Sequence, residues 1–518
     1  MEEWQYCRFV GSDLGSTAYT SMMPRFHEGW PSGALAELVD NALEAGAKSL
    51  DIQLVTPNSE DHQLILTDDG IGLDRLALER MLKLGCDTDT RKTNNHYGYG
   101  LKSGSLGLGH SVLVFTKTME CEVHVGKLDA ERLRCREECM ARKVLIRGVA
   151  VLSKRLVDPK LLIPVILWLP NGKPMIKGST AEEVYEPADG RVTGVLKELK
   201  SGPSSATEFT ALMNVIGTSC NMRLPEIQSH FESIGTETGT RVVVLMDHNQ
   251  HDPAFTTVFG NNEVDIEISG SRRHRGDRPG NISMDFSVLA YLELIYRNAD
   301  MAMTLNGKTP IVPRTIEDRL LDKIKTQVKI THRMFSKGEL TDSRVESTLD
   351  VNLGFSPKDC DLGAYGFFIY FMNRQTQKRR LVLSYHGYKG PGYEGPIGHE
   401  GPDGPFMAGS GNRKRDKRGK FDGMVGVIEL DDSMVKVENG KQKFSKQSVD
   451  HFFTALDKEL AACVQKYFDN SLFQTLRRMN DFTPYGPSSK LSSCPPHRLL
   501  YLPAPTGPPP FASVPALT

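Results

Sequence analysis

The chain lacks the features that mark several large classes of protein. Its nine cysteines, an odd number, include no Cys-x-x-Cys pair, so the sequence predicts reduced thiols in a reducing compartment. Cys135 and Cys139 lie one helical turn apart, but no second pair completes a metal site. No apolar run approaches the roughly eighteen residues of a membrane helix, and the start Met1-Glu2-Glu3-Trp4 is too acidic and polar for a signal peptide. We therefore expect a soluble, intracellular protein with no membrane partner.

An excess of charge is also missing. The 63 basic and 64 acidic residues leave a formal net charge of −1, so no overall basic field attracts nucleic acid. Two basic, glycine-containing stretches stand out locally, at 272–278 and 413–420. Each could be a solvated loop or could contact DNA phosphates without sequence preference, and the second could instead be a nuclear import signal.

The common phosphate-binding motifs are absent as well. The chain has no Gly-x-x-x-x-Gly-Lys-Ser/Thr loop, and no His-Arg-Asp or Asp-Phe-Gly motif of protein kinases. Three polar segments are present instead, and together they indicate an ATP site.

The first segment lies in residues 34–45, which contain strong helix formers. Four apolar residues follow the spacing of a buried stripe: Leu35, Leu38, Val39 and Ala42. Glu37, Asn41 and Glu44 share another face, since residues three and four apart are neighbours on a helix. Glu37 could accept a proton from water while Asn41 offers a neutral oxygen to magnesium, or the face could simply be solvated.

The second segment, Asp68-Asp69-Gly70-Ile71-Gly72, follows the apolar run 64–66 and predicts a strand that ends in a glycine turn. Asp68 could accept a hydrogen bond from an amino group such as that of adenine. Gly70 and Gly72 would let a flat base lie against bare backbone. The alternative is an ordinary turn.

The third segment, residues 98–105, is rich in glycine and contains Lys102. Its backbone N–H groups could cradle phosphates, with Lys102 as a point charge. The alternative is a flexible surface loop.

The order of these segments, followed by the apolar strand that Gly239 and Thr240 open, resembles the four boxes of the GHKL superfamily: gyrase, heat-shock chaperones, histidine kinases and MutL mismatch-repair proteins. Within it, the lid Gly-Tyr-Gly-Leu-Lys-Ser-Gly-Ser at 98–105, followed by residues 111–117, looks like the Microrchidia (MORC) chromatin ATPases. Residues 287–296 and 303–308 are similar to the start of the MORC transducer domain. The resemblance covers most of residues 12–470.

The resemblance implies an α+β fold with two domains. A GHKL (Bergerat) α/β sandwich ATPase domain would occupy residues 1–270, and a ribosomal-protein-like α/β transducer domain would occupy 271–482. The transducer would contain a disordered insert rich in glycine, proline and basic residues at about 387–420. A proline-rich, disordered tail would follow at 483–518. The apolar patterns predict strands at 366–372 and 423–430, then a helix with one apolar face formed by Phe452, Phe453, Leu456, Leu460 and Val464.

The resemblance also implies a role for each matching residue. Glu37 and Lys441 would be catalytic, as the general base and as the transducer lysine that reaches the terminal phosphate, with Lys443 as the alternative to Lys441. Asn41 would bind Mg²⁺. The remaining matches would bind ATP: Asp68 and Thr240 at the adenine, Gly70 and Gly72 against the base, and Gly98, Gly100, Leu101, Lys102, Ser103 and Gly104 around the phosphates.

The function so implied is an ATP-dependent clamp that forms a homodimer on binding ATP. It would hydrolyse ATP slowly in the nucleus to organise or compact DNA in chromatin and gene silencing, with non-specific DNA and chromatin proteins as partners. The sequence of residues 41–47 resembles that of MutL proteins more than that of most MORC proteins, so a MutL-like mismatch-repair ATPase is one alternative. A scaffold that binds ATP without hydrolysing it is another.

Overall fold

The computed structural model describes twenty segments of the chain: 31–58, 61–82, 99–121, 126–127, 143–153, 163–169, 172–178, 198–199, 203–247, 258–261, 265–269, 287–296, 300–312, 316–336, 339–357, 366–372, 379–383, 423–436, 445–469 and 471–481. Several predicted features lie outside the described residues: Gly98, Lys441, Lys443, the cysteine pair 135 and 139, both basic stretches, the insert and the tail.

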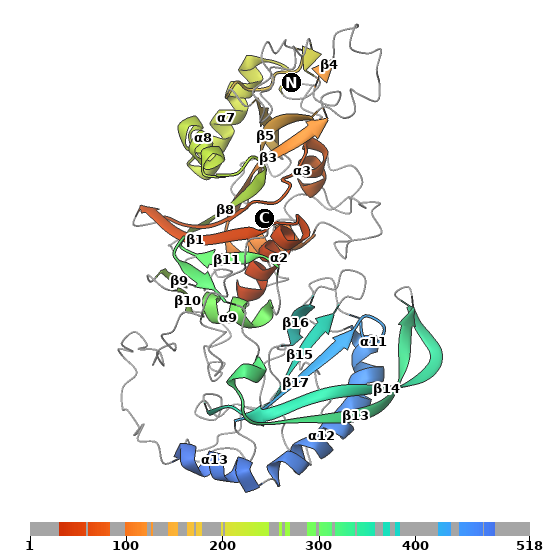
Figure 1. The fold of residues 1–518 in the computed structure, drawn as a ribbon. Coiled ribbons are helices and arrows are strands. Elements are labelled where there is room, and N and C mark those ends of the chain that lie inside the picture. Colours follow the sequence, from red (N-terminus) through yellow and green to blue (C-terminus); the bar gives the residue numbers. More distant parts are fainter. Residues whose placement is uncertain are drawn as a thin grey trace, which may run out of the picture.

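An eight-stranded sheet dominates the first part of the fold (Figure 1), with the strand order β12-β11-β1-β2-β8-β3-β5-β6. Its members are β1 (Ser49–Asn58), β2 (Asp61–Asp68), β3 (Ser111–Cys121), β5 (Lys143–Ser153), β6 (Ile163–Trp168), β8 (Gly239–Asp247), β11 (Ala302–Leu305) and β12 (Thr309–Ile311). Neighbouring strands are antiparallel except β1 and β11, which run parallel. In the central strand β8, residues 242–245 are all buried, which is why this strand reads as a continuous apolar run.

Helices cover both faces of this sheet. Side chains alternate along each strand, so Leu64 and Leu66 point to one face and Ile65 to the other. The first face packs against α2 (Pro31–Glu44), α3 (Arg75–Leu82), α4 (Tyr99–Leu108) and α9 (Val288–Ile295), and the second against α7 (Ala206–Cys220) and α8 (Leu224–Glu232). The structure therefore confirms the mixed α+β fold.

A second sheet follows in the order β13-β14-β17-β15-β16. Its strands are β13 (Leu321–Ser336), β14 (Glu339–Phe355), β15 (Gly366–Met372), β16 (Arg379–Leu383) and β17 (Met424–Asp431). One face packs against α12 (Thr454–Phe468) and α13 (Ser471–Asp481), which follow α11 (Lys446–Ser448) and the π-helix η7 (Val449–Phe453). The predicted strands at 366–372 and 423–430 are confirmed as β15 and β17. All five residues of the predicted apolar helix face are buried in this core.

The smaller elements are the paired strands β4 (Gly126–Lys127) and β7 (Glu198–Leu199), the paired strands β9 (Val258–Asn261) and β10 (Ile266–Ser269), and the short helix η6 (Ile316–Arg319). No helix in the described segments combines the length and apolar character of a bilayer-spanning one.

The two sheets are joined through α9, which lies between them (Figure 1). Phe368 and Tyr370 of β15 share one hydrophobic cluster with Leu292 of α9 and Val39 of α2. The first sheet also includes β11 and β12, although the sequence suggested a division at residue 270. The division between the sheets instead falls between β12 and β13.

Candidate active site

The helix α2 carries Glu37 and Asn41, and its ends are set by local sequence. It begins at Pro31, whose fixed φ suits a first helical turn. It ends at Glu44, and Gly46, two residues later, has φ of +72°. Ala47 N–H donates to Ala42 O, and Gly46 N–H donates to Leu43 O, which is the hydrogen-bond pattern of a Schellman cap.

Glu37 is more buried than an amphipathic helix face predicts. Only 2% of its surface is exposed, whereas Asn41, one turn later, is half-buried. The cause is α4, which crosses α2 at Gly104. A Cβ on Gly104 would lie 2.6 Å from Ala34 O and 3.2 Å from the Cβ of Glu37. Glycine at this position therefore lets the backbone of α4 approach the carboxylate-bearing turn.

The predicted lid segment is helical from Tyr99 onward, so the alternative of a flexible surface loop does not hold for its described residues. The first N–H groups of a helix have no partner within the helix, so the start of α4 near Gly100 and Leu101 is suited to an anion. Ser103 and Ser105 hydroxyls donate to carbonyls of the preceding turn, at 3.3 and 2.6 Å.

Lys102 lies deeper than a phosphate-binding point charge would. It is 1% exposed and borders a small apolar hollow together with Met81, Leu101, Val112, Val114, Ala150 and Leu152. Its aliphatic chain therefore contributes to the core, and the phosphate role of its ammonium group stays a prediction.

Asp68 ends β2 directly opposite Thr240, the second residue of β8. Both side chains are buried, and Gly70 N–H donates to Asp68 Oδ1 at 2.9 Å. Burial raises the pKa of Asp68 from 3.8 to about 6, even though the backbone N–H groups of Gly70 and Thr240 favour the charged form. The sheet thus holds the desolvated carboxylate of Asp68 beside Thr240, the residue predicted to bind adenine together with it.

The turn after Asp68 is fixed against β3. Thr116 Oγ1 accepts a hydrogen bond from Leu73 N–H at 2.7 Å, and Thr118 Oγ1 donates to Ile71 O at 2.9 Å. Gly72 has φ of +71°, and a Cβ there would lie 2.1 Å from Lys117 O. Gly72 is therefore required for the turn to close onto the strand.

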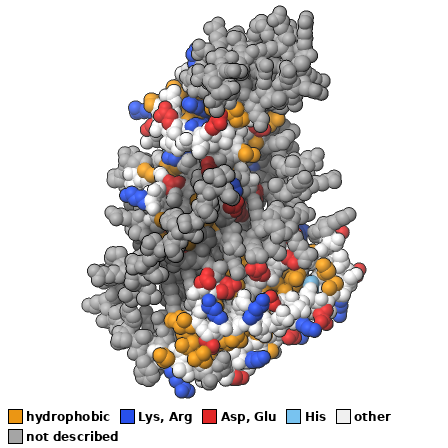
Figure 2. All heavy atoms as spheres, in the orientation of Figure 1, with side chains coloured by type: hydrophobic (Ala, Val, Ile, Leu, Met, Phe, Trp, Pro, Cys, Tyr) orange, Lys and Arg blue, Asp and Glu red, His pale blue; other side chains and the backbone are white. Residues whose placement is uncertain are grey.

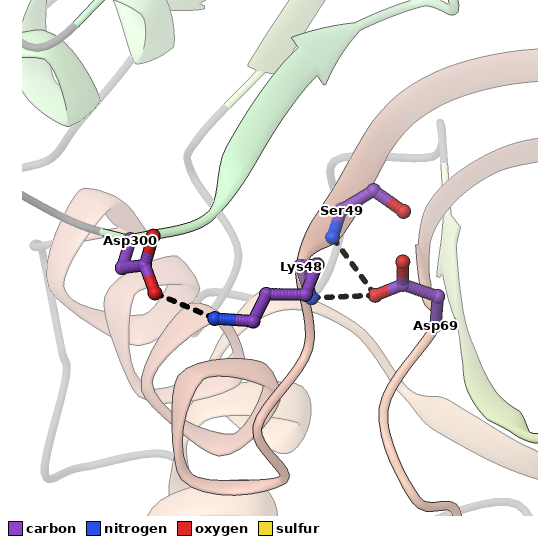
Figure 3. Close-up of polar contacts among 4 residues, drawn as sticks. All are labelled: Lys48, Ser49, Asp69 and Asp300. Atoms are coloured by element: carbon purple, nitrogen blue, oxygen red, sulfur yellow. Dashed lines mark hydrogen bonds and ion pairs between the residues drawn. The ribbon is translucent and has the colours of Figure 1, made fainter.

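Asp69 organises the other side of the same turn (Figure 3). Its Oδ1 accepts from the backbone N–H of Lys48 at 2.7 Å and of Ser49 at 2.8 Å. Partial burial opposes ionisation, but these hydrogen bonds dominate and lower the pKa of Asp69. The Lys48 side chain pairs with Asp300, 2.5 Å away, next to β11. Neighbouring aspartates thus have opposite pKa shifts.

A buried arginine supports the Asp68–Thr240 pair from the next position of the ladder. Arg241 donates through Nη1 to Thr67 Oγ1 at 2.6 Å and through Nε to His230 Nδ1 at 3.1 Å. Burial, with the charge of Arg241, lowers the pKa of His230 to about 4, so the ring is a neutral acceptor. Sequence reasoning missed both residues, because nothing local to Arg241 predicts a histidine eleven residues earlier as its partner.

Helix α2 brings the separate segments together. Near its start it contacts α4 at Glu37, and after its end Ala45 O accepts from Ile71 N–H at 3.2 Å in the Asp68 turn. Eight residues of helical rise separate Glu37 from Ala45, which is about 12 Å. That separation suits a nucleotide with its base at Asp68 and its phosphates at the start of α4.

The donor set fits magnesium bound largely through phosphate. Within the described ranges, no group of three or more His, Cys, Asp or Glu side chains is arranged to hold a metal. Magnesium keeps several waters and takes nucleotide oxygens, so a single half-buried amide such as Asn41 is a sufficient protein ligand.

Comparison with known proteins shows which families the part of the chain that holds this site is similar to. The family model "Histidine kinase-, DNA gyrase B-, and HSP90-like ATPase" matches residues 30–145, which include α2, the Asp68 turn and α4. The 43K ATPase domain of Thermus thermophilus gyrase B in complex with an aminocoumarin covers 90% of this chain, and 94% of its own chain is covered. Its TM-score is 0.28 at 12% identity, which is too low to carry weight.

Curated relatives carry the Microrchidia name. Protein MICRORCHIDIA 6 of Arabidopsis thaliana is 21% identical over 71% of this chain and 50% of its own length. ATPase morc-1 of Caenorhabditis elegans is 40% identical over 17% of this chain and 10% of its own length. MORC family CW-type zinc finger protein 3 of Mus musculus is 39% identical over 18% of this chain and 10% of its own length. This chain therefore spans half or less of these relatives' lengths. Residues 30–145, which hold α2, the Asp68 turn and α4, thus match a GHKL-type ATPase domain, and the chain is similar to proteins of the MORC family.

Proposed function

We propose that the chain is an ATP-gated clamp of the MORC type, in which Glu37 is the general base for ATP hydrolysis. One observation carries the proposal: the helix that bears Glu37 packs against the glycine-rich helix α4, and Ala45 directly after it accepts a hydrogen bond from Ile71 N–H in the Asp68 turn. A single rigid element thus fixes the base-binding and phosphate-binding ends of one nucleotide.

The adenine would bind at Asp68 and Thr240. At neutral pH Asp68 is mostly ionised, since its pKa is about 6, yet it has lost most of its solvation. An exocyclic amino group would supply the hydrogen-bond donor that water no longer provides. Ile71, which is 71% exposed, lies two residues after Asp69 and could cover the edge of the base.

The phosphates would lie at the start of α4, beside Glu37. In this pose Glu37 accepts the proton of the attacking water, and Asn41 binds magnesium. The ion, when bound, neutralises charge that develops on the phosphate oxygens. Because Glu37 is buried against α4, a bound nucleotide would contact α4 and α2 at once and fix their relative position. Nucleotide binding would in this way be linked to closure of the clamp.

The lysine that reaches the terminal phosphate would be Lys441, with Lys443 as the alternative. The described residues on either side of that segment are held together: Ser445 N–H donates to Lys436 O at 2.8 Å, and Lys436 N–H donates to Ser448 Oγ at 2.7 Å. Ser448 is fully buried. These hydrogen bonds would therefore fix both ends of the segment that contains the lysine, so that the second sheet and α11 could hold the lysine toward the terminal phosphate.

Homodimerisation on ATP, a nuclear location, and action on DNA in chromatin and gene silencing are parts of the same proposal. Non-specific DNA contact is not favoured on the β13–β14 ribbon. There, Lys325, Lys329 and Arg333 form ion pairs with Asp350, Glu346 and Asp342. Basic and acidic side chains intermingle on this part of the visible face (Figure 2). A phosphate contact would have to come from elsewhere on the molecule.

The test is the Glu37→Ala variant, with Glu44→Ala, two turns further along α2, as the control. Glu37→Ala should bind ATP, lose hydrolysis and accumulate as a dimer in light scattering with ATP and magnesium. Glu44→Ala should retain hydrolysis. Unchanged turnover in Glu37→Ala would remove the base assignment. No hydrolysis by the wild-type protein, with ATP binding retained, would make the ATP-binding scaffold the better description.

The DNA proposal has its own test. Gel shifts at several salt concentrations, with and without a non-hydrolysable ATP analogue, should show binding that weakens steeply with salt. No binding even at low salt would end the DNA part of the proposal without affecting the ATPase.

A further inference from the structure

A buried tyrosine from a distant part of the chain is bonded to the catalytic helix. Tyr296, directly after α9, is 2% exposed, and its hydroxyl lies 2.9 Å from Ala36 O and 2.9 Å from Asp40 Oδ1. Asp40 is itself only 8% exposed. These contacts join residues 256 and 260 positions apart, so they are a tertiary link and not a local cap.

The two acceptors bracket the reactive turn. Ala36 precedes Glu37, and Asp40 precedes Asn41, so Tyr296 holds the helix one residue before each predicted functional group. A buried carboxylate is costly without a hydrogen-bond donor, which makes the tyrosine a strong constraint on the position of Asp40. Loss of the hydroxyl would remove two of the contacts that fix the position of this turn.

The element that carries Tyr296 is anchored at its other end as well. Near the start of α9, Leu289 N–H donates to Asp265 Oδ1 at 2.9 Å, and the Ser287 hydroxyl donates to the same carboxylate. Along its length α9 packs against α2, β12 and β16. It therefore connects the second sheet to α2 as a short strut (Figure 1).

We propose that Tyr296 is a positioning residue for hydrolysis: through Ala36 and Asp40 it sets Glu37 and Asn41 against the nucleotide, and through α9 it links their position to the second sheet. This inference rests on the proposed function of Glu37. It predicts a larger defect in turnover than in nucleotide affinity, because the acceptors of the hydroxyl, in Ala36 and Asp40, are not part of the adenine-binding pair Asp68 and Thr240.

The experiment compares Tyr296→Phe with Tyr467→Phe in the full chain. Tyr467 is also a buried tyrosine whose hydroxyl donates to a carbonyl, that of Asp322 at 2.9 Å, but it lies in the second core. Tyr296→Phe should lower kcat about tenfold with little change in KM for ATP, which is the loss expected for a hydrogen bond to a charged group. Tyr467→Phe should leave both constants unchanged. Equal kcat values in the two variants would overturn the proposal.

A double-mutant cycle gives a second readout that does not depend on comparing stabilities. Asp40→Ala combined with Tyr296→Phe should lower kcat by clearly less than the product of the two single losses, because both changes remove the Tyr296–Asp40 contact and only the contact with Ala36 O is lost in addition. Asp40→Asn, which keeps an acceptor oxygen, should retain more activity than Asp40→Ala. Additive losses in the cycle would contradict the link. If Glu37→Ala abolishes hydrolysis while the cycle is additive, the positioning role fails and the proposed base survives.

Discussion

Replacing Asp68 with asparagine should stabilise the nucleotide-free protein while removing ATP binding. The pKa of Asp68 is raised from 3.8 to about 6 by burial. Each pKa unit corresponds to about 1.4 kcal/mol, so holding this carboxylate ionised costs up to about 3 kcal/mol of folding free energy at neutral pH. The Asp68→Asn variant isolates this cost, because the amide has nearly the shape of the carboxylate and lacks its charge.

The pH dependence follows from the direction of the shift. A group with a raised pKa stabilises the folded state below its unfolded pKa, and that stabilisation is lost as pH rises through the folded value. Wild type and Asp68→Asn should therefore melt alike near pH 4 and diverge between about pH 4 and 7. Above pH 7 the variant should have the higher Tm by several degrees, given about 2–4 °C per kcal/mol for a domain of this size. The gain is an upper limit, because an amide has one acceptor oxygen for the two N–H groups of Gly70 and Thr240.

The assay is thermal melting of both proteins from pH 4 to pH 8, with and without ATP and magnesium. Ligand should raise the Tm of wild type and leave Asp68→Asn unchanged. Asp69→Asn is the matched control, because hydrogen bonds lower the pKa of Asp69. Its ionised form stabilises the fold above its unfolded pKa and loses that effect as pH falls, so Asp69→Asn should melt lower at neutral pH. A wild-type protein more stable than Asp68→Asn at pH 7.5 would refute the reasoning.

Three further changes test the packing around the site. Gly104→Ala places a Cβ 2.6 Å from Ala34 O, and relieving that overlap should lower the free energy of unfolding by about 1–3 kcal/mol and slow hydrolysis. Thermal melting and phosphate release measure the two effects, and wild-type values for both would show that α4 can move freely. Thr116→Val removes the acceptor of Leu73 N–H inside the core and should cost about 1–3 kcal/mol, which urea melts would reveal, and an unchanged midpoint would contradict the anchoring role. Ser448→Ala removes the hydroxyl that accepts from Lys436 N–H next to the segment that contains Lys441, and it should lower kcat severalfold with only a small change in Tm. An unaltered kcat would show that this contact has no part in catalysis.

Local patterns were enough to predict several elements. The apolar spacing in 34–45 predicted α2, and the glycine turn after 64–66 predicted the end of β2, because both signals arise within a few residues. The apolar residues at 452–464 likewise predicted a helix face that is buried in the second core. These predictions depend on periodicity, which the final fold preserves.

Features that depend on tertiary contacts could not be predicted. The glycines of 98–105 left a flexible loop open as the alternative to a lid, and no local pattern predicted that Gly104 of the helix α4 packs closely on Ala34. The pairing of β1 with β11 joins residues some 250 positions apart, and no pattern in 300–312 identifies its partner strand. The Tyr296–Asp40 contact has the same character, since a buried tyrosine directly after an apolar helix has many conceivable acceptors.

The parallel pairing of β11 with β1 also bears on how the chain is made. Ser49 to Ile52 pair with Ala302 to Leu305, and Asn306 N–H and Gly307 N–H then bond to Ile52 O and to Asp51 Oδ1. A ribosome must therefore release the chain past residue 311 before the first sheet can be completed. Until then, the outer edge of β1 exposes unpaired backbone groups, the kind of edge to which a neighbouring nascent chain can add.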